Sequence, residues 1–468
     1  MDRYITAIDL GSTKVVTAVG ENTSKGVKII SYKEAPSKGI IKGEIINIQN
    51  VLDSLKPTIE ETAKIIGMTP NKILAGIAGQ NIKCLYSTKE KRRRDPADLI
   101  TTEEIEELKR EMSNTKVGEG ERILHVIPQS YNIDEHMNVT EPVGMEGERI
   151  EGNYLMFIGK TSSTDSCNTV IKKAGLNLDN LILEPIASGR AVLSDNEKEI
   201  GVALVDIGGA TTDLIIIKDN TIRYAALIPF AGNSITEDIR QALGVPAKYA
   251  ELMKVYFGAC FSGYAEENKI IVLSGAEGAP RKEVSLKKLT EIIEARMSEI
   301  IATVNHEIEK SGLSNKIHGG IVLTGGSSNL AFIRHLTKAI TGYQVRLAKP
   351  SNLITDDSVE EVYKASASTA VGLVLMGFDD MERAASADDD IDSDDTDINY
   401  GNNHSPSGTL FGNHFGNEDT NRKDDKKVKP PKPPKVPKPP KENKGKSLFG
   451  GIIGGIFGDI TSDNDNGA

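Results

Sequence analysis

Two segments of this chain, roughly two hundred residues apart, share one pattern. In each, an apolar strand-like run ends in an aspartate, a turn with glycine and hydroxyl residues follows, and a second apolar run comes next. The first reads IDLGSTK from Ile8 to Lys14, and the second reads LVDIGGATTD from Leu204 to Asp213. Repetition at such a distance predicts two related lobes of an α/β protein rather than a short-period solenoid.

The chemistry of these turns suits the phosphates of a nucleotide. Glycine lets backbone N–H groups approach phosphate oxygens closely, and the hydroxyls of Ser12, Thr13 and Thr211 add donors. Asp9 and Asp206 cannot approach phosphate favourably, but each can hold a hydrated Mg²⁺ that does. One such turn alone is more often an ordinary β-turn, so the matched pair is what predicts a triphosphate clamped between two lobes.

Apolar runs and helical patterns alternate regularly through the first 378 residues. A helix is predicted over Leu99–Met112, where a Thr-x-x-Glu capping box begins at either Thr101 or Thr102. A long amphipathic helix is predicted over Leu286–Lys310, ended by Gly312. The predicted strands are Tyr4–Asp9, Val15–Val19, Val27–Tyr32, Ile200–Asp206, Asp213–Lys218 and Ile321–Leu323.

Charge and cysteine usage exclude several classes of protein. The chain carries 56 Lys and Arg against 67 Asp and Glu, a formal net charge of −11, so we expect no nucleic-acid partner, which would need a basic footprint. Cys84, Cys167 and Cys260 lie far apart, which excludes a disulfide scaffold or a zinc ribbon and fits a reducing compartment. The sequence has no run of 18 apolar residues and no secretory signal, so we expect a cytoplasmic protein.

The composition changes near Gly377. An acidic run over 379–398, a stretch rich in Asn, Gly and Ser, and a Lys-Pro run over 430–441 follow. Such sequence cannot bury enough apolar area to offset its chain entropy, so we expect a disordered linker over 379–445, stiffer where prolines gather. The last residues, 461–468, are expected to be disordered as well.

A short apolar cluster follows the linker, within 446–460. On a helix, its bulky side chains fall on one half of the circumference and glycines on the other, and lysines precede it. Apolar insertion beside basic residues is the two-signal arrangement of a peripheral membrane anchor, and the segment is too short to span a bilayer. We expect an amphipathic helix that binds anionic lipid, the alternative being a docking peptide for a protein. The membrane-facing residues would be Leu448, Phe449, Ile452, Ile453, Ile456, Phe457 and Ile460.

The paired turns resemble the phosphate 1 and phosphate 2 motifs of the ATPase superfamily that includes actin, Hsp70 and the sugar kinases. Four further segments resemble the remaining motifs of this superfamily. They are a first connector over 183–188 (LEPIAS), a ribose-binding helix over 250–254 (AELMK), an adenosine motif over 321–328 (IVLTGGSS) and a second connector over 365–373 (ASASTAVGL). So many ordered motifs make chance similarity a poor explanation.

Within this superfamily, the chain resembles the FtsA family of bacterial cell-division proteins. Three segments carry that narrower resemblance: PSKGIIKG over 36–43, ILAGIAG over 73–79 with a separate unit after it, and GNSITEDI over 232–239. The linker with its terminal apolar cluster is a fourth feature. Ala210 departs from the family pattern, because a third glycine is usual in phosphate 2 and the extra methyl crowds the closest backbone approach.

The resemblance implies a two-lobed, actin-like ATPase fold with an inserted small α+β subdomain, 1C. Lobe 1, or subdomain 1A, would comprise residues 1–83 and 161–195, with the insert over 84–160. Lobe 2 would comprise subdomain 2A, over 196–229 and 311–378, and subdomain 2B, over 230–310.

The resemblance also implies a site for ATP and Mg²⁺ between the lobes. Asp9 and Asp206 would orient the Mg²⁺ through its waters, and Glu184 would position an attacking water, the alternative being a carboxylate at a helix start before a proline. Lys254 would reach the ribose, the alternative being a solvated helix charge. The nucleotide-binding residues would be Gly11, Ser12, Thr13, Lys14, Gly208, Gly209 and Thr211 at the phosphates, Glu251 and Lys254 at the ribose, and Gly325, Gly326 and Ser327 at the adenosine.

The function implied is that of a scaffold of cell division. A protein of this family would link FtsZ filaments to the inner face of the cytoplasmic membrane at the division septum, form filaments itself and recruit later division proteins. ATP hydrolysis would be slow, with ATP acting mainly as a polymerisation switch. The FtsZ C-terminal peptide would dock on 2B at Arg296, Glu299 and Asn305, an ordinary exposed arginine being the alternative for Arg296.

Three other classes of protein were weighed against this function. An Hsp70-like chaperone would need a peptide-binding domain after the ATPase, and the tail is too short for one. A sugar or metabolite kinase would need an acceptor pocket with a catalytic base, and no sugar-kinase signature occurs in the sequence. The related pilus-assembly actin homologue normally lacks this tail.

Overall fold

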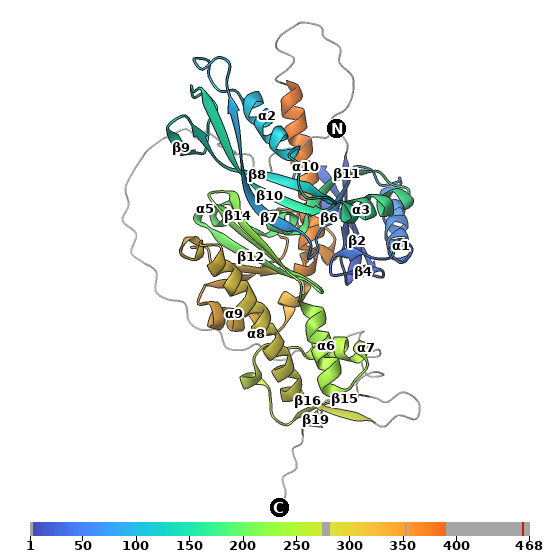
Figure 1. Ribbon diagram of the computed structural model, residues 1–468. Helices are drawn as coiled ribbons and strands as arrows, with labels where there is room; N and C mark the ends of the chain where they lie inside the picture. The colour runs from blue at the N-terminus through green and yellow to red at the C-terminus, as the bar shows by residue number, and fades with distance from the viewer. Residues whose placement is uncertain (1–2, 274–280, 352, 390–460, 463–468) are drawn as a thin grey trace, which may run out of the picture. The chain divides into compact units, whose positions relative to one another are not determined.

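A computed structural model describes residues 3–273, 281–351, 353–389 and 461–462 (Figure 1). Contacts within the chain define two compact units. The large unit consists of residues 1–265 and 287–408, and the small unit of residues 266–286 and 409–468.

The first sheet of the large unit has five strands in the order β11-β6-β1-β2-β3. β1 pairs antiparallel with β2 and parallel with β6, and the three predicted N-terminal strands are confirmed. A small hairpin of β4 (Ile40–Ile41) and β5 (Glu44–Ile45) follows β3. The sheet strands are β1 Tyr4–Leu10, β2 Lys14–Thr23, β3 Gly26–Pro36, β6 Ile73–Ile77 and β11 Leu178–Leu183.

Side-chain alternation along β1 gives this sheet two apolar faces. Ile8 packs with α1 (Ile48–Ile66) and α3 (Thr161–Lys173) in one buried cluster. Ile5 points to the opposite face, where α10 (Ser368–Asp389) lies so close that a β-carbon at Gly377 would be 2.5 Å from Ile5 Cγ2. The sheet is therefore sandwiched between helices, as an α/β fold requires.

The second sheet repeats the connectivity of the first, in the order β14-β13-β12-β17-β18. β12 pairs antiparallel with β13 and parallel with β17, as β1 does with β2 and β6. This repetition confirms the prediction of two related lobes. The strands are β12 Val202–Ile207, β13 Thr212–Lys218, β14 Thr221–Ile228, β17 Ile321–Thr324 and β18 Val345–Leu347.

Two helices join the lobes where the connectors were predicted. α4 (Glu184–Val192) packs on α10, and a β-carbon at Gly372 of α10 would lie 1.8 Å from the carbonyl oxygen of Ala187. Only glycine allows two helix backbones to approach so closely. The remaining helices of lobe 2 are α5 Asp195–Ile200, α6 Gly232–Leu243, α7 Ala247–Phe257, α8 Leu286–Lys310 and α9 Ile333–Thr341, and α8 has the bounds that were predicted.

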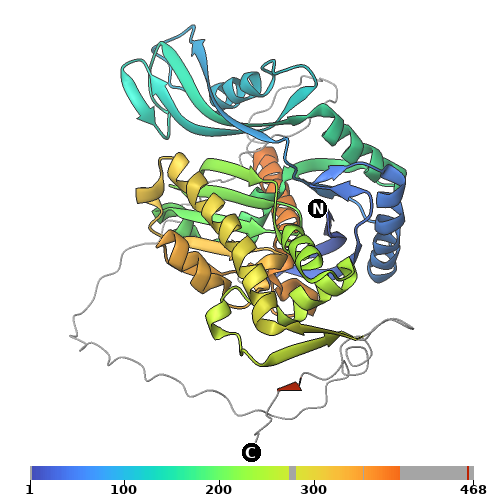
Figure 2. The same ribbon diagram turned by 60° about the horizontal axis from the view of Figure 1, so that its bottom comes forward.

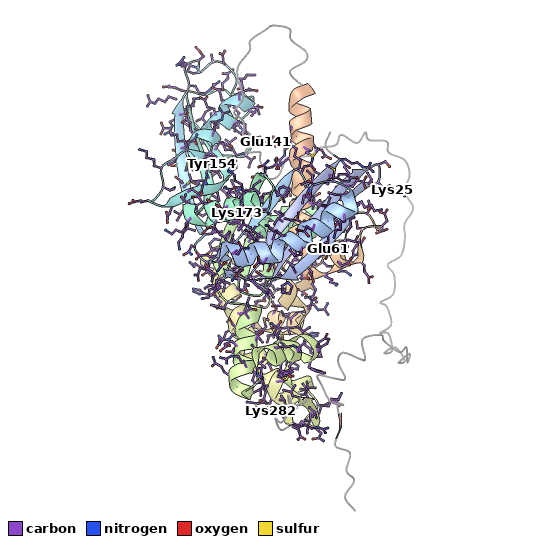
Figure 3. All side chains as sticks on the ribbon, turned by 90° about the vertical axis from the view of Figure 1, so that its right-hand side faces the viewer. Lys25, Glu61, Glu141, Tyr154, Lys173 and Lys282 are labelled. Carbon is purple, nitrogen blue, oxygen red and sulfur yellow. The ribbon has the colours of Figure 1, made fainter. Side chains whose placement is uncertain are left out.

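The insert has its own sheet, in the order β7-β10-β8-β9, and forms a separate layer in cyan and blue in Figure 2. Its helix α2 (Thr102–Ser113) is capped by Thr101, which decides between the two predicted candidates. Tyr154 is fully buried in its core against the edge of Tyr131, with ring centroids 6.3 Å apart (Figure 3). The strands are β7 Lys83–Arg92, β8 Glu121–Ile133, β9 His136–Val139 and β10 Arg149–Lys160.

Two expectations for the C-terminal tail are wrong in part. Helix α10 continues past residue 378 to Asp389, because Asp379 accepts two hydrogen bonds from Arg190 of α4, at 2.7 and 2.9 Å, and so gains a folded partner. In the small unit, Thr461–Ser462 form a strand, β19, that pairs with β15 (Lys269–Leu273), whose other neighbour is β16 (Lys282–Ser285).

The other predictions for the tail concern residues that the structure does not describe. The linker over 390–445, the amphipathic helix over 446–460 and residues 463–468 lie outside the described residues. Within the described ranges, no helix is both long and apolar enough to cross a bilayer.

Candidate nucleotide site

The structure brings the two glycine-containing turns face to face. A β-carbon added to Gly209 would lie 1.8 Å from Thr13 Oγ1, although the two residues belong to different lobes. Such a separation is far below any van der Waals contact. Thr13 fits there only because residue 209 is a glycine and has no side chain. The two turns are therefore in direct contact across the lobes.

The first turn is held by a segment that lies after β3. Ser12 Oγ accepts a hydrogen bond of 2.9 Å from the backbone N–H of Gly43. The ammonium of Lys14 donates to the hydroxyl of Tyr32 at 2.7 Å and to Glu34 at 2.6 Å. In this structure Lys14 is thus paired with strand β3, and its predicted contact with phosphate stays a prediction.

The second turn is held by the adenosine motif and the first connector. Ser327 Oγ donates to the carbonyl oxygen of Gly208 at 2.7 Å, and Ser188 Oγ donates to Asp206 Oδ2 at 2.7 Å. Gly325 adopts a φ of +86°, and a β-carbon there would lie 2.3 Å from Asp206 Oδ1. Three of the predicted motifs therefore meet at Asp206 and its turn, where Gly326 and Thr211 also lie.

Four carboxylates from these motifs are close enough to repel one another. Burial, and then the charge of Asp206, raise the pKa of Asp9 to about 6, while Lys14 opposes the shift. Burial also raises the pKa of Asp206, against the hydrogen bond from Ser188. The pKa of Asp213 is raised well above its usual range by burial and by Asp206. Without a cation, each of these carboxyl groups therefore keeps a proton more readily than an exposed carboxyl does, and a bound cation would favour the ionised forms.

Glu184 is the fourth carboxylate, and it stands at the first position of α4 before Pro185. The helix-start alternative is therefore correct as a description of its place. Its pKa is nevertheless raised well above the usual range, by burial and then by Asp9, Asp213 and Asp206. Glu184 thus combines a structural position at the helix start with a place among the site carboxylates.

This arrangement fits a Mg²⁺ held through water. Asp213 is 5% exposed, and its Oδ1 has no hydrogen-bond partner in the described structure. A buried, unpaired carboxylate oxygen among like charges calls for a cation or ordered water. Within the described ranges, no three His, Cys, Asp or Glu side chains converge as direct metal ligands.

The predicted ribose contacts lie beside the second turn. Lys254, on α7, is only 8% exposed, so its alternative as a solvated helix charge is wrong. Its ammonium donates to the carbonyl oxygen of Gly232 at 3.0 Å and to Thr236 Oγ1 at 2.8 Å, and it pairs with Glu251 at 2.8 Å. A β-carbon at Gly232 would lie 2.4 Å from Ser327 Oγ, which ties this group to the adenosine motif.

The chain is 34% identical over 382 residues to the cell division protein FtsA of Pseudomonas aeruginosa, a match that covers 80% of this chain and 89% of that protein. The chain belongs to the FtsA family. The FtsA of Neisseria meningitidis is 31% identical over 374 residues, with coverage of 80% and 89%. Family models described as cell division protein FtsA and as the SHS2 domain inserted in FtsA match residues 203–372 and 79–158.

A solved structure shows how far the fold is shared beyond the FtsA family. The PilM-PilN type IV pilus biogenesis complex matches with a TM-score of 0.57 at 14% identity, covering 80% of this chain and 98% of that chain. At that identity the likeness shows the fold alone. The fold is the predicted two-lobed, actin-like ATPase fold with an inserted α+β subdomain.

Three contributors to this site were not predicted from the sequence. Asp213 belongs to the phosphate 2 segment, and its register opposite Asp206 follows from a simple hairpin. Ser188 and Thr369 come from the two connectors, and their hydroxyls lie 3.0 Å apart. Their places depend on the crossing of α4 and α10, which no local pattern reveals.

The predicted partner-binding residues lie along α8. Arg296 donates to both carboxylate oxygens of Asp238, at 2.5 and 3.0 Å, and to Glu299 at 2.6 Å. Asn305 donates to Glu309 at 2.9 Å. Arg296 is thus a partly exposed, ion-paired arginine, and its role in docking stays a prediction.

Proposed function

We propose that this chain is an ATP-binding scaffold of bacterial cell division that tethers FtsZ filaments to the inner face of the cytoplasmic membrane at the septum. One observation carries the proposal: the match to a cell division protein extends over 89% of that protein's length, at 34% identity. The predicted tail, with its apolar cluster after a long linker, supports the tethering role.

The nucleotide part of the proposal is supported by the geometry of the two turns. Thr13 faces Gly209 across the lobes, and Asp9 and Asp213, which belong to the strands beside the two turns, are buried with raised pKa values. Asp9 and Asp206 would hold the waters of Mg²⁺, and the bound ion would neutralise the charge of the triphosphate. ATP would act mainly as a switch for filament formation, with slow hydrolysis in which Glu184 would position the attacking water.

Calorimetry tests the nucleotide site. The full chain should bind Mg-ATP, and Asp206→Asn should weaken binding by at least tenfold because the variant cannot hold the hydrated ion as a full charge. Asp219→Asn is the matched control, since Asp219 lies at the far end of β13 and is largely exposed. Absence of heat at millimolar Mg-ATP, or equal affinities for the two variants, would remove the foundation of the proposal.

Vesicle sedimentation tests the membrane tether. The full chain should sediment with vesicles rich in phosphatidylglycerol, and a chain that ends at residue 445 should stay in the supernatant. A chain that ends at Ser462 keeps the apolar cluster and serves as the control. Co-sedimentation of the shorter chain at the same level as the full chain would reject the anchor and favour a protein-docking role for this segment.

Peptide binding tests the FtsZ contact on α8. Arg296→Glu should abolish binding of a labelled FtsZ C-terminal peptide measured by anisotropy, and Lys310→Glu, at the end of the same helix, should not. Self-association into filaments and recruitment of later division proteins belong to the same proposed role. If the peptide binds both variants as tightly as it binds the unchanged chain, α8 is excluded as the docking site.

A further inference from the structure

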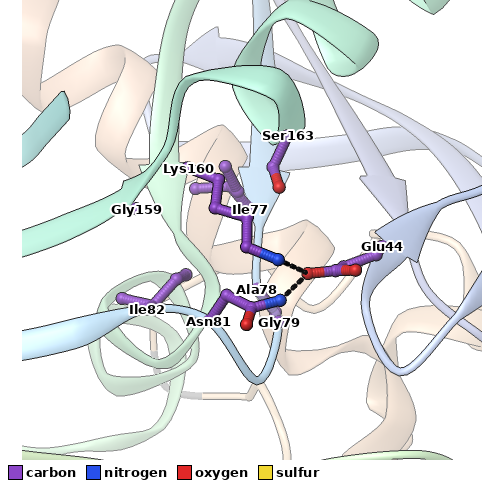
Figure 4. A pocket seen from close by; sticks show the side chains of 9 residues that line it. All are labelled: Glu44, Ile77, Ala78, Gly79, Asn81, Ile82, Gly159, Lys160 and Ser163. Atoms are coloured by element: carbon purple, nitrogen blue, oxygen red, sulfur yellow. Dashed lines mark hydrogen bonds and ion pairs between the residues drawn. The ribbon is translucent and has the colours of Figure 1, made fainter. Parts of the chain in front are cut away.

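Glu44 lies at the junction of lobe 1 and the insert. One of its carboxylate oxygens, Oε1, accepts a hydrogen bond from the side-chain amide of Asn81 and lies 3.6 Å from the ammonium of Lys160 (Figure 4). Asn81 precedes β7, the strand that enters the insert, and Lys160 ends β10, the strand that leaves it. A single carboxylate therefore holds both places where the chain crosses between lobe 1 and the insert.

The backbone next to Glu44 touches the first phosphate turn. Gly43 donates its N–H to Ser12 Oγ at 2.9 Å. Gly43 has a φ of +77°, and a β-carbon there would come within 2.8 Å of Gly79 Cα, so the segment is packed as well as hydrogen-bonded. One peptide unit thus separates a contact with the phosphate turn from a contact with the insert.

We propose that Glu44 couples the nucleotide state of the first turn to the position of the insert. The coupling rests on the proposed binding of ATP. A serine hydroxyl has one donor and two acceptor sites, so Ser12 can donate to a phosphate oxygen while it accepts from Gly43. A donor engaged in this way strengthens the bond that the same oxygen accepts. Phosphate at the turn therefore orders Gly43. The carboxylate of Glu44, which binds Asn81 and Lys160, becomes ordered with it.

A purely local role for Glu44 makes a different prediction. Lys160 is the N-cap residue of α3, and a carboxylate beside a helix start is stabilising whether or not nucleotide is present. Under that role, loss of Glu44 would lower stability equally with and without ATP. Under coupling, the insert responds to ATP only through this contact. Restraining the insert would then change the affinity for ATP by the same factor by which ATP shifts the equilibrium position of the insert.

Hydrogen exchange on the full chain tests the coupling. In the unchanged chain, Mg-ATP should slow exchange in the two crossing segments, 79–83 and 157–161. Glu44→Lys should abolish that response and weaken ATP binding by about fivefold, at the low end of allosteric couplings. Adding Lys160→Glu to it should restore both, because the charge pair is rebuilt with reversed polarity and the amide of Asn81 can present its oxygen instead.

Glu121→Lys is the matched control. It breaks the ion pair of Glu121 with Lys83, which joins β8 to β7 near the same crossing but has no contact with the phosphate turn. Its ATP response and affinity should equal those of the unchanged chain. A full response in Glu44→Lys, no rescue in the double variant, or an equal loss in Glu121→Lys would each overturn the coupling. A chain that binds no ATP in calorimetry would instead reject the proposed function itself.

Discussion

The contact between Gly209 and Thr13 makes a prediction that tests the whole site. Gly209→Ala places a methyl 1.8 Å from Thr13 Oγ1, whereas an ordinary contact would need at least 3.4 Å. The two turns must therefore separate by about 1.5 Å, or Thr13 must leave its rotamer. Overpacking of this kind costs about 1–3 kcal/mol in the free energy of unfolding.

Removing the hydroxyl of Thr13 should remove most of that cost. In Thr13→Ala, the nearest remaining atom of residue 13 would be its β-carbon, 3.2 Å from the new methyl. We therefore expect Gly209→Ala to cost less than about 1 kcal/mol in that background, a coupling of about 1–2 kcal/mol between two residues that are far apart in sequence.

Urea unfolding of the full chain without nucleotide, followed by far-ultraviolet circular dichroism, measures the four free energies of this cycle. Gly208→Ala is the control, because a β-carbon there meets only the carbonyl oxygen of Thr211, at 3.1 Å, in its own turn. Its cost should not depend on residue 13. If the cost of Gly209→Ala is the same in both backgrounds, the turns are not apposed in solution and the proposed clamp is refuted.

Three further predictions concern the cap, the ribose group and pH. Thr101→Ala should lower the free energy of unfolding by about 1 kcal/mol because it removes the capping box of α2, whereas Thr102→Ala should change it far less in the same urea titration. Lys254→Met should weaken Mg-ATP binding in calorimetry and lower the thermal midpoint, since it removes one of two side-chain donors to the carbonyl of Gly232 and the ion pair with Glu251, while the exposed Lys248→Met should alter neither. The pKa of Asp9, raised to about 6, means that the folded state holds this proton more tightly than the unfolded state does, so stability without nucleotide should fall as pH rises from about 4 to about 6, by up to about 3 kcal/mol. Asp9→Asn should reduce that slope in urea titrations at several pH values, and the remainder comes from the raised pKa values of Asp206, Asp213 and Glu184. An unchanged slope in this variant would show that Asp9 contributes nothing to it.

Much of the fold follows from local patterns. The apolar runs beside the two aspartates predict β1, β2, β12 and β13, because period and turn chemistry are properties of neighbouring residues. The bounds of α8 agree with the prediction for the same reason, as its apolar face and its glycine stop are both local signals. The capping box is a local signal too, since Thr101 has Glu104 three residues later whereas Thr102 has Ile105 there.

The predicted end of the ordered fold differs from the observed one for a physical reason. Order was expected to end at residue 378 because the sequence after it is acidic and polar, yet Arg190 of α4 binds Asp379 and the helix continues. A charge that is unfavourable in an isolated segment is stabilised by a partner from elsewhere in the fold. The local composition around Asp379 does not reveal that Arg190 will be its partner.

By itself, therefore, the sequence determined which residues end strands at a glycine turn, and so which chemistry the chain could support. Only the tertiary structure decided that Thr13 meets Gly209, that Asp213 is left buried with an unpaired oxygen, and that Glu44 grips both crossings of the insert. The reason is that hydrophobic period and turn preference act over a few residues. Burial, repulsion between carboxylates and close backbone approach arise only when the packing of distant segments excludes water between them.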